Sequence, residues 1–460
     1  MRIVMLTDDR KIDRRIMLEA ETLCAQNYEV IVLALWEHGL AYHEVYGNVK
    51  IERIQPVKKF SFESVLTLFF SLLIRTMTGL SRKIQSKFSY REGKQGFSQK
   101  LFRVALTSVV FVFHKIVEAL TFVLKANLYV LRTFKKRTAH DEMFYQRACY
   151  YAPDIIHVHD LPQLRAGTLV KKQLNIPLIY DAHELYPEIS TLNPSQKKRL
   201  SKLEHQLLPL CDEVITVNAF IAKEMSYRYH IKPPQVILNA TQTPAQFSLD
   251  KKYNLFREYF CIAQNEKILL FQGWMSKDRG LQTLVQAMKE VPSHIHLVLM
   301  GYGEALPELE TLVSSLCLEN RVHFRTVVAQ NELLYWTASA DVGIIPYQAI
   351  DLNNYYCSPN KLFEFIQARI PIIANDLPFL RKIVHDEAIG IVAPLTDCSN
   401  YANAIQKVFE LEASVPGFKH RLNAAAKKYH WRVEGEKLYS IYQQVTVCKK
   451  QSYSNRGRHD

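Results

Sequence analysis

The sequence lacks the short motifs that hold metals and common cofactors. Its eight cysteines are scattered over 460 residues without a C-x-x-C pair and without neighbouring histidines, so we expect reduced thiols and no zinc framework. No Asp-x-Asp triplet is present to clamp a cation on a diphosphate. Neither a G-x-x-x-x-G-K-[ST] loop nor a G-x-G-x-x-G loop follows the first predicted strand. We therefore predict no metal site and no required cofactor.

Long apolar runs are also missing. The first ten residues, MRIVMLTDDR, lack the apolar stretch of a signal peptide and are typical of a strand followed by a polar loop. Hydrophobic residues make up 48% and charged residues 22% of the chain, which excludes both a disordered chain and a polytopic membrane protein. We expect a cytoplasmic protein with two folded cores.

Positive charge is concentrated in one segment. The net charge is +13, but residues 60–137 hold fourteen of the 58 basic residues and only three of the 45 acidic ones. Outside that segment the charges nearly balance. This distribution argues against a nucleic-acid surface and favours a local anionic partner such as lipid headgroups.

Short apolar strands alternate with helical patterns along two stretches of the chain. Strands of this kind, separated by helices, predict parallel sheets covered on both faces. We expect two doubly wound, Rossmann-like α/β domains with a helical, hydrophobic and basic insertion in the first. The expected parts are a domain over 1–240 with the insertion at 60–137, a linker over 241–265, a domain over 266–430, a helix over 431–448 and a polar tail over 449–460.

The segment SPNKLFE, residues 358–364, is the strongest candidate for a binding site. Ser358 is a good helix N-cap and Pro359 a good first helical residue, so we expect a helix whose free N–H groups attract an anion. Lys361 and Glu364 are three residues apart and share one face. This pair suits a nucleoside diphosphate, with the lysine on phosphate and the carboxylate on the ribose hydroxyls. A capped helix with a surface ion pair is the plainer alternative.

Further candidate residues follow predicted strands, at the sheet edge where ligands bind in open α/β sheets. Two groups lie in the second domain. Gly273 to Gly280 has a glycine at each end, which lets the backbone approach a ligand, and Arg279 can grip a diphosphate. Gly301 and Gly303 flank Tyr302, although such a pair is often only a tight turn.

Two neighbouring strand ends in the first domain each place a histidine beside a carboxylate. His159 and Asp160 end one strand, and His183 and Glu184 follow the next. The alternative is that each histidine is packed in the core and contacts no ligand.

Taken together, these motifs resemble the family-four glycosyltransferases of the retaining GT-B type, in which two Rossmann-like domains face each other across a cleft. The resemblance runs from residue 1 to about residue 440, apart from the basic insertion, and is carried by the order of the motifs. It implies that the second domain binds a UDP- or GDP-sugar and that the first binds the acceptor. Transfer would then proceed with retention of configuration.

The resemblance assigns roles to individual residues. His159, Arg279 and Lys361 match catalytic positions, the first near the donor sugar and the other two at the diphosphate. Two further groups are expected in the binding sites. The donor-binding positions are Gly273, Gly301, Gly303, Asn360 and Glu364, and the acceptor or cleft positions are Asp8, Asp160, His183 and Glu184.

The chain departs from the family pattern at three places. Tyr356 stands where the family's E-x7-E element has its first glutamate, so Asn353 or Asn354 would have to contact the sugar hydroxyls instead. Trp274 replaces a frequent arginine. Residues 7–10, TDDR, replace the glycine-rich first loop, which leaves the shape of the acceptor pocket open.

The insertion predicts where the protein acts. Between Arg103 and Arg132 most polar residues fall on one narrow stripe of a helix, leaving a broad apolar face, and a second apolar segment covers 62–74 with a basic loop between the two. Neither segment is long enough to span a bilayer, so we expect insertion at an anionic membrane surface. A buried helical hairpin or dimer contact is the alternative.

We therefore expect a peripheral enzyme on the inner face of the cell membrane, with a lipid-linked saccharide or glycolipid acceptor and no nucleic-acid partner. The oligomeric state stays open. Two other functions are alternatives, a nucleotide-sugar epimerase on the same architecture and a non-catalytic, membrane-bound subunit that binds a nucleotide sugar.

Overall fold

The computed structural model describes residues 1–55, 138–248, 251 and 253–456. Residues 1–54 and the described residues from 144 onward form one compact unit. The predicted membrane-binding insertion lies outside the described residues. Within the described ranges no helix is long and apolar enough to cross a bilayer.

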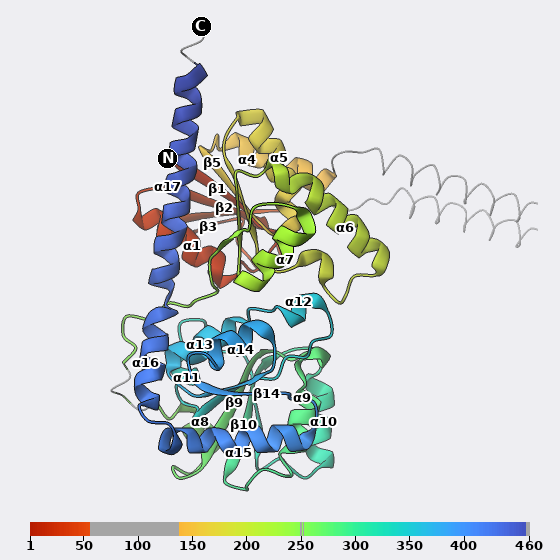
Figure 1. The fold of residues 1–460 in the computed structure, drawn as a ribbon, viewed down its shortest axis with the longest axis vertical. Helices are drawn as coiled ribbons and strands as arrows, with labels where there is room; N and C mark the ends of the chain where they lie inside the picture. Colours follow the sequence, from red (N-terminus) through yellow and green to blue (C-terminus); the bar gives the residue numbers. More distant parts are fainter. Residues whose placement is uncertain (56–137, 249–250, 252, 457–460) are drawn as a thin grey trace, which may run out of the picture. The chain divides into compact units, whose positions relative to one another are not determined.

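The N-terminal half of the first unit is a sheet in the order β3-β4-β2-β1-β5-β6-β7-β8 (Figure 1). Its strands are β1 (Arg2–Leu6), β2 (Glu29–Leu35), β3 (His43–Tyr46), β4 (Val49–Ile54), β5 (Ile155–His159), β6 (Leu178–Ala182), β7 (Glu213–Thr216) and β8 (Gln235–Val236). Its helices are α1 (Arg14–Ala25), α4 (Ala139–Tyr150), α5 (Asp160–Leu174), α6 (Pro194–Leu207) and α7 (Ala219–Tyr229), with short 3-10 turns at Tyr186–Glu188 and Leu208–Leu210. Among these strands only the pair β3 and β4 is antiparallel.

The C-terminal half is a parallel sheet in the order β11-β10-β9-β12-β13-β14. Its strands are β9 (Lys267–Trp274), β10 (Ile295–Tyr302), β11 (Val322–Arg325), β12 (Val342–Ile345), β13 (Ile372–Asn375) and β14 (Gly390–Ala393). Its helices are α8 (Leu255–Phe260), α9 (Leu281–Ala287), α10 (Leu306–Ser315), α11 (Leu333–Thr337), α12 (Leu352–Tyr355), α13 (Asn360–Ala368), α14 (Pro378–Val384), α15 (Cys398–Ser414) and α16 (Phe418–Lys428), with a 3-10 turn at Lys277–Arg279.

Both sheets have the doubly wound, mainly parallel topology expected from the sequence. Their central strands are buried along almost their whole length, which explains the continuous apolar runs. Two strands and several helices were not predicted. The hairpin of β3 and β4 was missed because every residue of β3 is exposed and polar residues interrupt β4.

The last helix, α17 (Trp431–Arg456), returns to the N-terminal sheet (Figure 1). It packs against α1, where the Trp431 indole donates a hydrogen bond to Thr22 Oγ1 at 2.8 Å. The helix was predicted only over 431–448, with a polar tail beyond. That end point is wrong, since the helix continues to Arg456, and the polar composition of 449–456 did not end it.

Candidate active site

A cavity of about 390 Å³ opens at the carboxyl ends of β9 and β10. Residues from these two strand ends and from the first turn of α13 line it, which is the arrangement that binds ligands in open α/β sheets. The lining residues that the sequence singled out are Gly273, Trp274, Gly301, Tyr302, Asn360, Lys361 and Glu364. The structure thus brings the predicted donor-binding residues of the second domain together, with Gly303 next to this group in the chain.

Lys361 is the most informative residue of the cavity. Its side chain is 5% exposed, and its ammonium has no hydrogen-bond partner among the described residues. The Nζ atom lies 3.7 Å from the centre of the Phe271 ring and near the Tyr347 ring. Burial, together with the nearby Arg279, holds the pKa of Lys361 well below its usual value. An unpaired buried cation costs free energy, and an anion entering the cavity would remove that cost.

Glu364 lies one turn further along α13 and is occupied on both oxygens. Arg14 of α1 donates to Oε1 at 2.6 Å, and Gln272 donates to Oε2. Its carboxylate therefore already accepts two hydrogen bonds, the same number that two ribose hydroxyl groups would donate. A ribose at this position would have to replace or share the contact with Arg14.

Arg279 lies behind the cavity wall. Its guanidinium stacks 3.7 Å from the centre of the Tyr347 ring, donates to Asn354 Oδ1 at 3.0 Å and pairs with Asp278 at 3.0 Å. Tyr347 does line the cavity, but Arg279 itself does not. To contact a diphosphate directly, its side chain would have to turn away from Asn354.

The glycines at the strand ends allow the two strands to approach closely. Gly301 has a φ of +152°, and a Cβ atom there would lie 2.0 Å from the carbonyl oxygen of Gly273. A side chain at Gly303 would meet the Met275 carbonyl in the same way, at 2.2 Å. A Cβ atom at Gly273 would lie 3.5 Å from Lys361 Nζ, so this backbone runs directly past the ammonium. These positions therefore require glycine for a structural reason.

The start of α13 differs from the prediction. Pro359 is the N-cap and Asn360 the first helical residue, whereas Ser358 lies outside the helix, with its hydroxyl lacking a partner among the described residues. The extended backbone of Pro359 explains the shift, because it places the helix start one residue later. The first turn still faces the cavity.

His159 and His183 are not among the residues that line this cavity. His159 is 1% exposed, and its Nδ1 lies 3.1 Å from His183 Nε2. Burial holds the pKa of His159 well below its usual value. Burial also favours neutral His183, but Asp160 and Asp181 outweigh it and raise the pKa of His183 to about 10. Any contact of His159 with a ligand would run through His183, which is partly exposed.

The predicted acceptor-side carboxylates occupy three different surroundings. Burial raises the pKa of Asp160 to about 7, and its Oδ1 accepts the backbone N–H of His183. Burial also raises the pKa of Glu184, whose Oε2 accepts a hydrogen bond from Asn353 at 3.0 Å. Asp8 accepts a weak bond from Gln163 at 3.4 Å. The structure brings Asp160 and His183 together, while the acceptor roles of all four residues stay predictions.

Tyr356 does not replace the missing glutamate. Its ring stacks on Phe220, with ring centres 6.1 Å apart, and its carbonyl accepts from Asn218. It does not line the cavity. Arg14 and Gln272 hold Glu364 but carry no signal in the sequence, because no local motif links them to α13.

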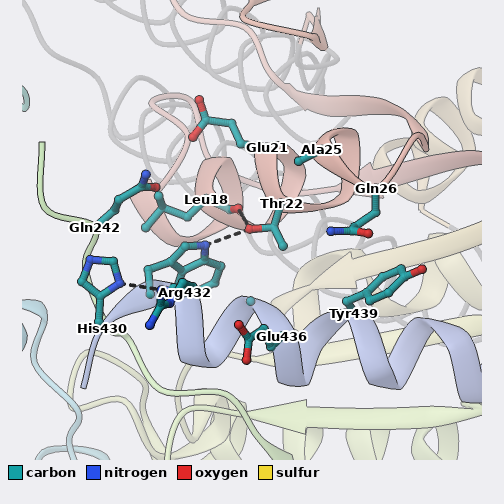
Figure 2. A pocket seen from close by; sticks show the side chains of 12 residues that line it. Leu18, Glu21, Thr22, Ala25, Gln26, Gln242, His430, Arg432, Glu436 and Tyr439 are labelled. Atoms are coloured by element: carbon teal, nitrogen blue, oxygen red, sulfur yellow. Dashed lines mark hydrogen bonds between the residues drawn. The ribbon is translucent and has the colours of Figure 1, made fainter. Parts of the chain in front are cut away.

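A larger cavity, of about 590 Å³, lies elsewhere, between α1 and α17 (Figure 2). Its walls include Glu21, Gln26, His430, Arg432 and Glu436. No strand end contributes to it, and no motif from the sequence points to it. Size alone therefore does not identify the site.

Comparison with known proteins agrees with the fold. The models of "Glycosyl transferases group 1" and "Glycosyltransferase Family 4" match residues 266–410 and 102–243, respectively. The chain belongs to this family of GT-B glycosyltransferases, enzymes that use nucleotide sugars.

Three relatives illustrate the similarity. A D-inositol 3-phosphate glycosyltransferase of Xylanimonas cellulosilytica is 23% identical over 64% of this chain and 72% of its own length. An alpha-monoglucosyldiacylglycerol synthase of Streptococcus pneumoniae is 24% identical over 52% of this chain and 56% of its own. The crystal structure of HepE from Anabaena in complex with UDP-glucose has a TM-score of 0.63 at 13% identity, covering 96% of this chain and 99% of that one. The last likeness shows the fold.

Proposed function

We propose that the chain transfers a sugar from a UDP- or GDP-sugar, with retention of configuration, to a lipid-linked saccharide or glycolipid at a membrane surface. One observation carries the donor half of this proposal. The buried ammonium of Lys361 has no partner among the described residues and lies in a cavity that also contains Glu364. The phosphates of a nucleoside diphosphate would supply the partner that the lysine lacks, and its ribose hydroxyls would share or replace the Arg14 contact of Glu364.

Charge develops on the departing diphosphate as the sugar–phosphate bond breaks, so its stabilisation lowers the barrier most effectively. Lys361 and the first N–H groups of α13 would hold this charge, and Arg279 would join them after leaving Asn354. Glu364 would fix the ribose. The departing phosphate would accept the proton of the acceptor hydroxyl, as expected for front-face attack. No carboxylate besides Glu364 lines the described cavity, so we expect transfer to need no metal at the diphosphate.

The acceptor half rests on the sequence and on one relative. The basic, apolar segment 60–137 belongs to the domain that holds the acceptor in this family, and the streptococcal relative is named for a glycolipid product. A lipid-linked acceptor at an anionic membrane, in envelope polysaccharide or glycoconjugate synthesis, fits both.

A flotation experiment tests the membrane half. Full-length protein should float with anionic phosphatidylglycerol vesicles at low salt, and deletion of 62–132 should abolish flotation while UDP binding persists. Full-length protein that stays unbound would contradict the proposal.

One observation favours a second function, a non-catalytic subunit that binds a nucleotide sugar. Tyr356 leaves the donor sugar without the family's carboxylate. Release of UDP or GDP from the matching nucleotide sugars, measured with and without membrane extract, separates the two functions, since a binding subunit releases neither.

A further inference from the structure

The last residues of β9 and β10 form an exposed aromatic pair at the cavity around Lys361. Trp274 and Tyr302 are register neighbours on the two strands, and both line the cavity. Their ring centres lie 4.9 Å apart, and the ring planes cross at 78°. Trp274 is 46% exposed and Tyr302 is 55% exposed. Two adjacent strand ends therefore present large rings to the cavity and to solvent.

Exposure of a single aromatic side chain is common on protein surfaces and needs no ligand. Here two rings meet edge to face at a cavity, so the pair still presents open ring faces. Tyr347, the third aromatic residue that lines the cavity, differs because Lys361 and Arg279 lie over its ring. Trp274 and Tyr302 are therefore the rings of this cavity on which a ligand can stack.

The other residues of the cavity indicate which part of a ligand meets this pair. The inference rests on the proposed function, which puts the phosphates at Lys361 and the ribose at Glu364. The base and the transferred sugar are the remaining parts of the donor, and only the base has a flat π-face. Besides Gln330, the lining residues without a role in this scheme are apolar: Trp274, Met300, Tyr302, Val327, Val328 and Leu333.

We propose that Trp274 and Tyr302 bind the base of the donor nucleotide by stacking. A stacked contact gives affinity without reading the edge of the base, because every base has a π-face. The contact is made by side chains that carry no charge, so it adds to the charged contacts of Lys361 and Glu364 without competing with them. The aromatic pair is thus a third element of the donor site, beside the lysine and the carboxylate.

Titration calorimetry on the full-length protein tests the proposal with two ligands. The first is UDP or GDP, whichever binds more tightly, and the second is ribose 5-diphosphate, which keeps the ribose and both phosphates but lacks the base. Trp274→Ala should raise the Kd for the nucleotide on the order of tenfold, the usual effect of removing one stacked ring. The Kd for ribose 5-diphosphate should stay unchanged. Tyr302→Ala should behave in the same way, and Trp274→Phe, which keeps a ring, should lose less affinity.

Tryptophan fluorescence gives an independent measurement, because stacking of a base on an indole quenches its emission. The nucleotide should quench part of the emission of the wild type, and this quenching should disappear in Trp274→Phe. Trp36→Phe is the matched control and should keep it. Trp36 stacks on Tyr42, with ring centres 5.1 Å apart, and does not line the cavity.

The two ligands separate failure of this inference from failure of the proposed function. Equal nucleotide affinities of the wild type and Trp274→Ala would overturn the stacking contact and leave the donor proposal standing. Equal losses for the nucleotide and ribose 5-diphosphate would also overturn it, because they would place the ring beside the phosphates or the ribose. So would a loss that appears with UDP-glucose and not with UDP, which would place the ring at the transferred sugar. Wild-type protein that binds neither UDP nor GDP would overturn both proposals.

Discussion

Replacement of Lys361 by methionine should change stability and ligand binding in opposite directions. Methionine has a similar length and no charge, so Lys361→Met removes a buried ammonium that has no partner among the described residues. Relief of its desolvation is worth about 1–3 kcal/mol, and loss of its contacts with the Phe271 and Tyr347 rings takes back about 1 kcal/mol. We expect the free protein to become more stable by about 1 kcal/mol.

The same substitution should weaken UDP binding. A hydrogen bond from a charged donor to phosphate is worth about 2 kcal/mol, which corresponds to a roughly 30-fold higher Kd. Urea unfolding gives the stability, and titration calorimetry gives the Kd. Lys277→Met is the matched control, because Lys277 is 70% exposed and pairs only with Glu308 among the described residues, so neither quantity should change by much. A less stable Lys361→Met protein that binds UDP normally would refute the reasoning.

Three further predictions concern the same cavity. UDP binding should take up protons at pH values between the pKa of Lys361 in the free protein, which burial lowers, and its higher pKa beside phosphate; calorimetry in buffers of different ionisation enthalpy measures this uptake, which Lys361→Met should abolish. Glu364→Gln should weaken UDP binding by about 2 kcal/mol, which corresponds to a roughly 30-fold higher Kd, whereas Glu304→Gln at an exposed position should not. Equal affinities of the wild type and Glu364→Gln for UDP would rule out the ribose contact. Gly301→Ala should destabilise the fold by about 2 kcal/mol or more in urea unfolding, while Gly417→Ala, with no atom within 4 Å, should cost only about 1 kcal/mol of backbone strain.

Much of the fold could be predicted from the sequence because its signals are local. The central strands are short and wholly apolar, and each is followed by a helical pattern, which indicates a parallel sheet without any knowledge of distant contacts. The hairpin of β3 and β4 lacks this signal. Its first strand is exposed on every residue, so no hydrophobic pattern distinguishes it from a loop.

The donor cavity was partly predictable for the same reason. Lys361 and Glu364 lie on one helix, three residues apart, and their shared face follows from helix geometry. Arg14, which holds Glu364, is 350 residues away in the chain, and no spacing rule connects the two. The buried group of Glu19, His157, His159 and Asp181 illustrates the same limit, since its members come from α1, β5 and β6 and form no short motif.

The burial of His159 was also not predictable from its position at a strand end. Strand ends usually project into the ligand site, but here His183 lies against His159, and Tyr442 of α17 and Glu19 of α1 lie against the neighbouring His157. These contacts come from distant parts of the chain.

The most direct test of the central claim is a crystal structure of the full-length protein with UDP. The account predicts the diphosphate within hydrogen-bond distance of Lys361 Nζ and at the start of α13, with the ribose hydroxyls on Glu364 and the Arg14 contact shared or displaced. UDP bound elsewhere, with Lys361 still lacking a partner, would contradict it.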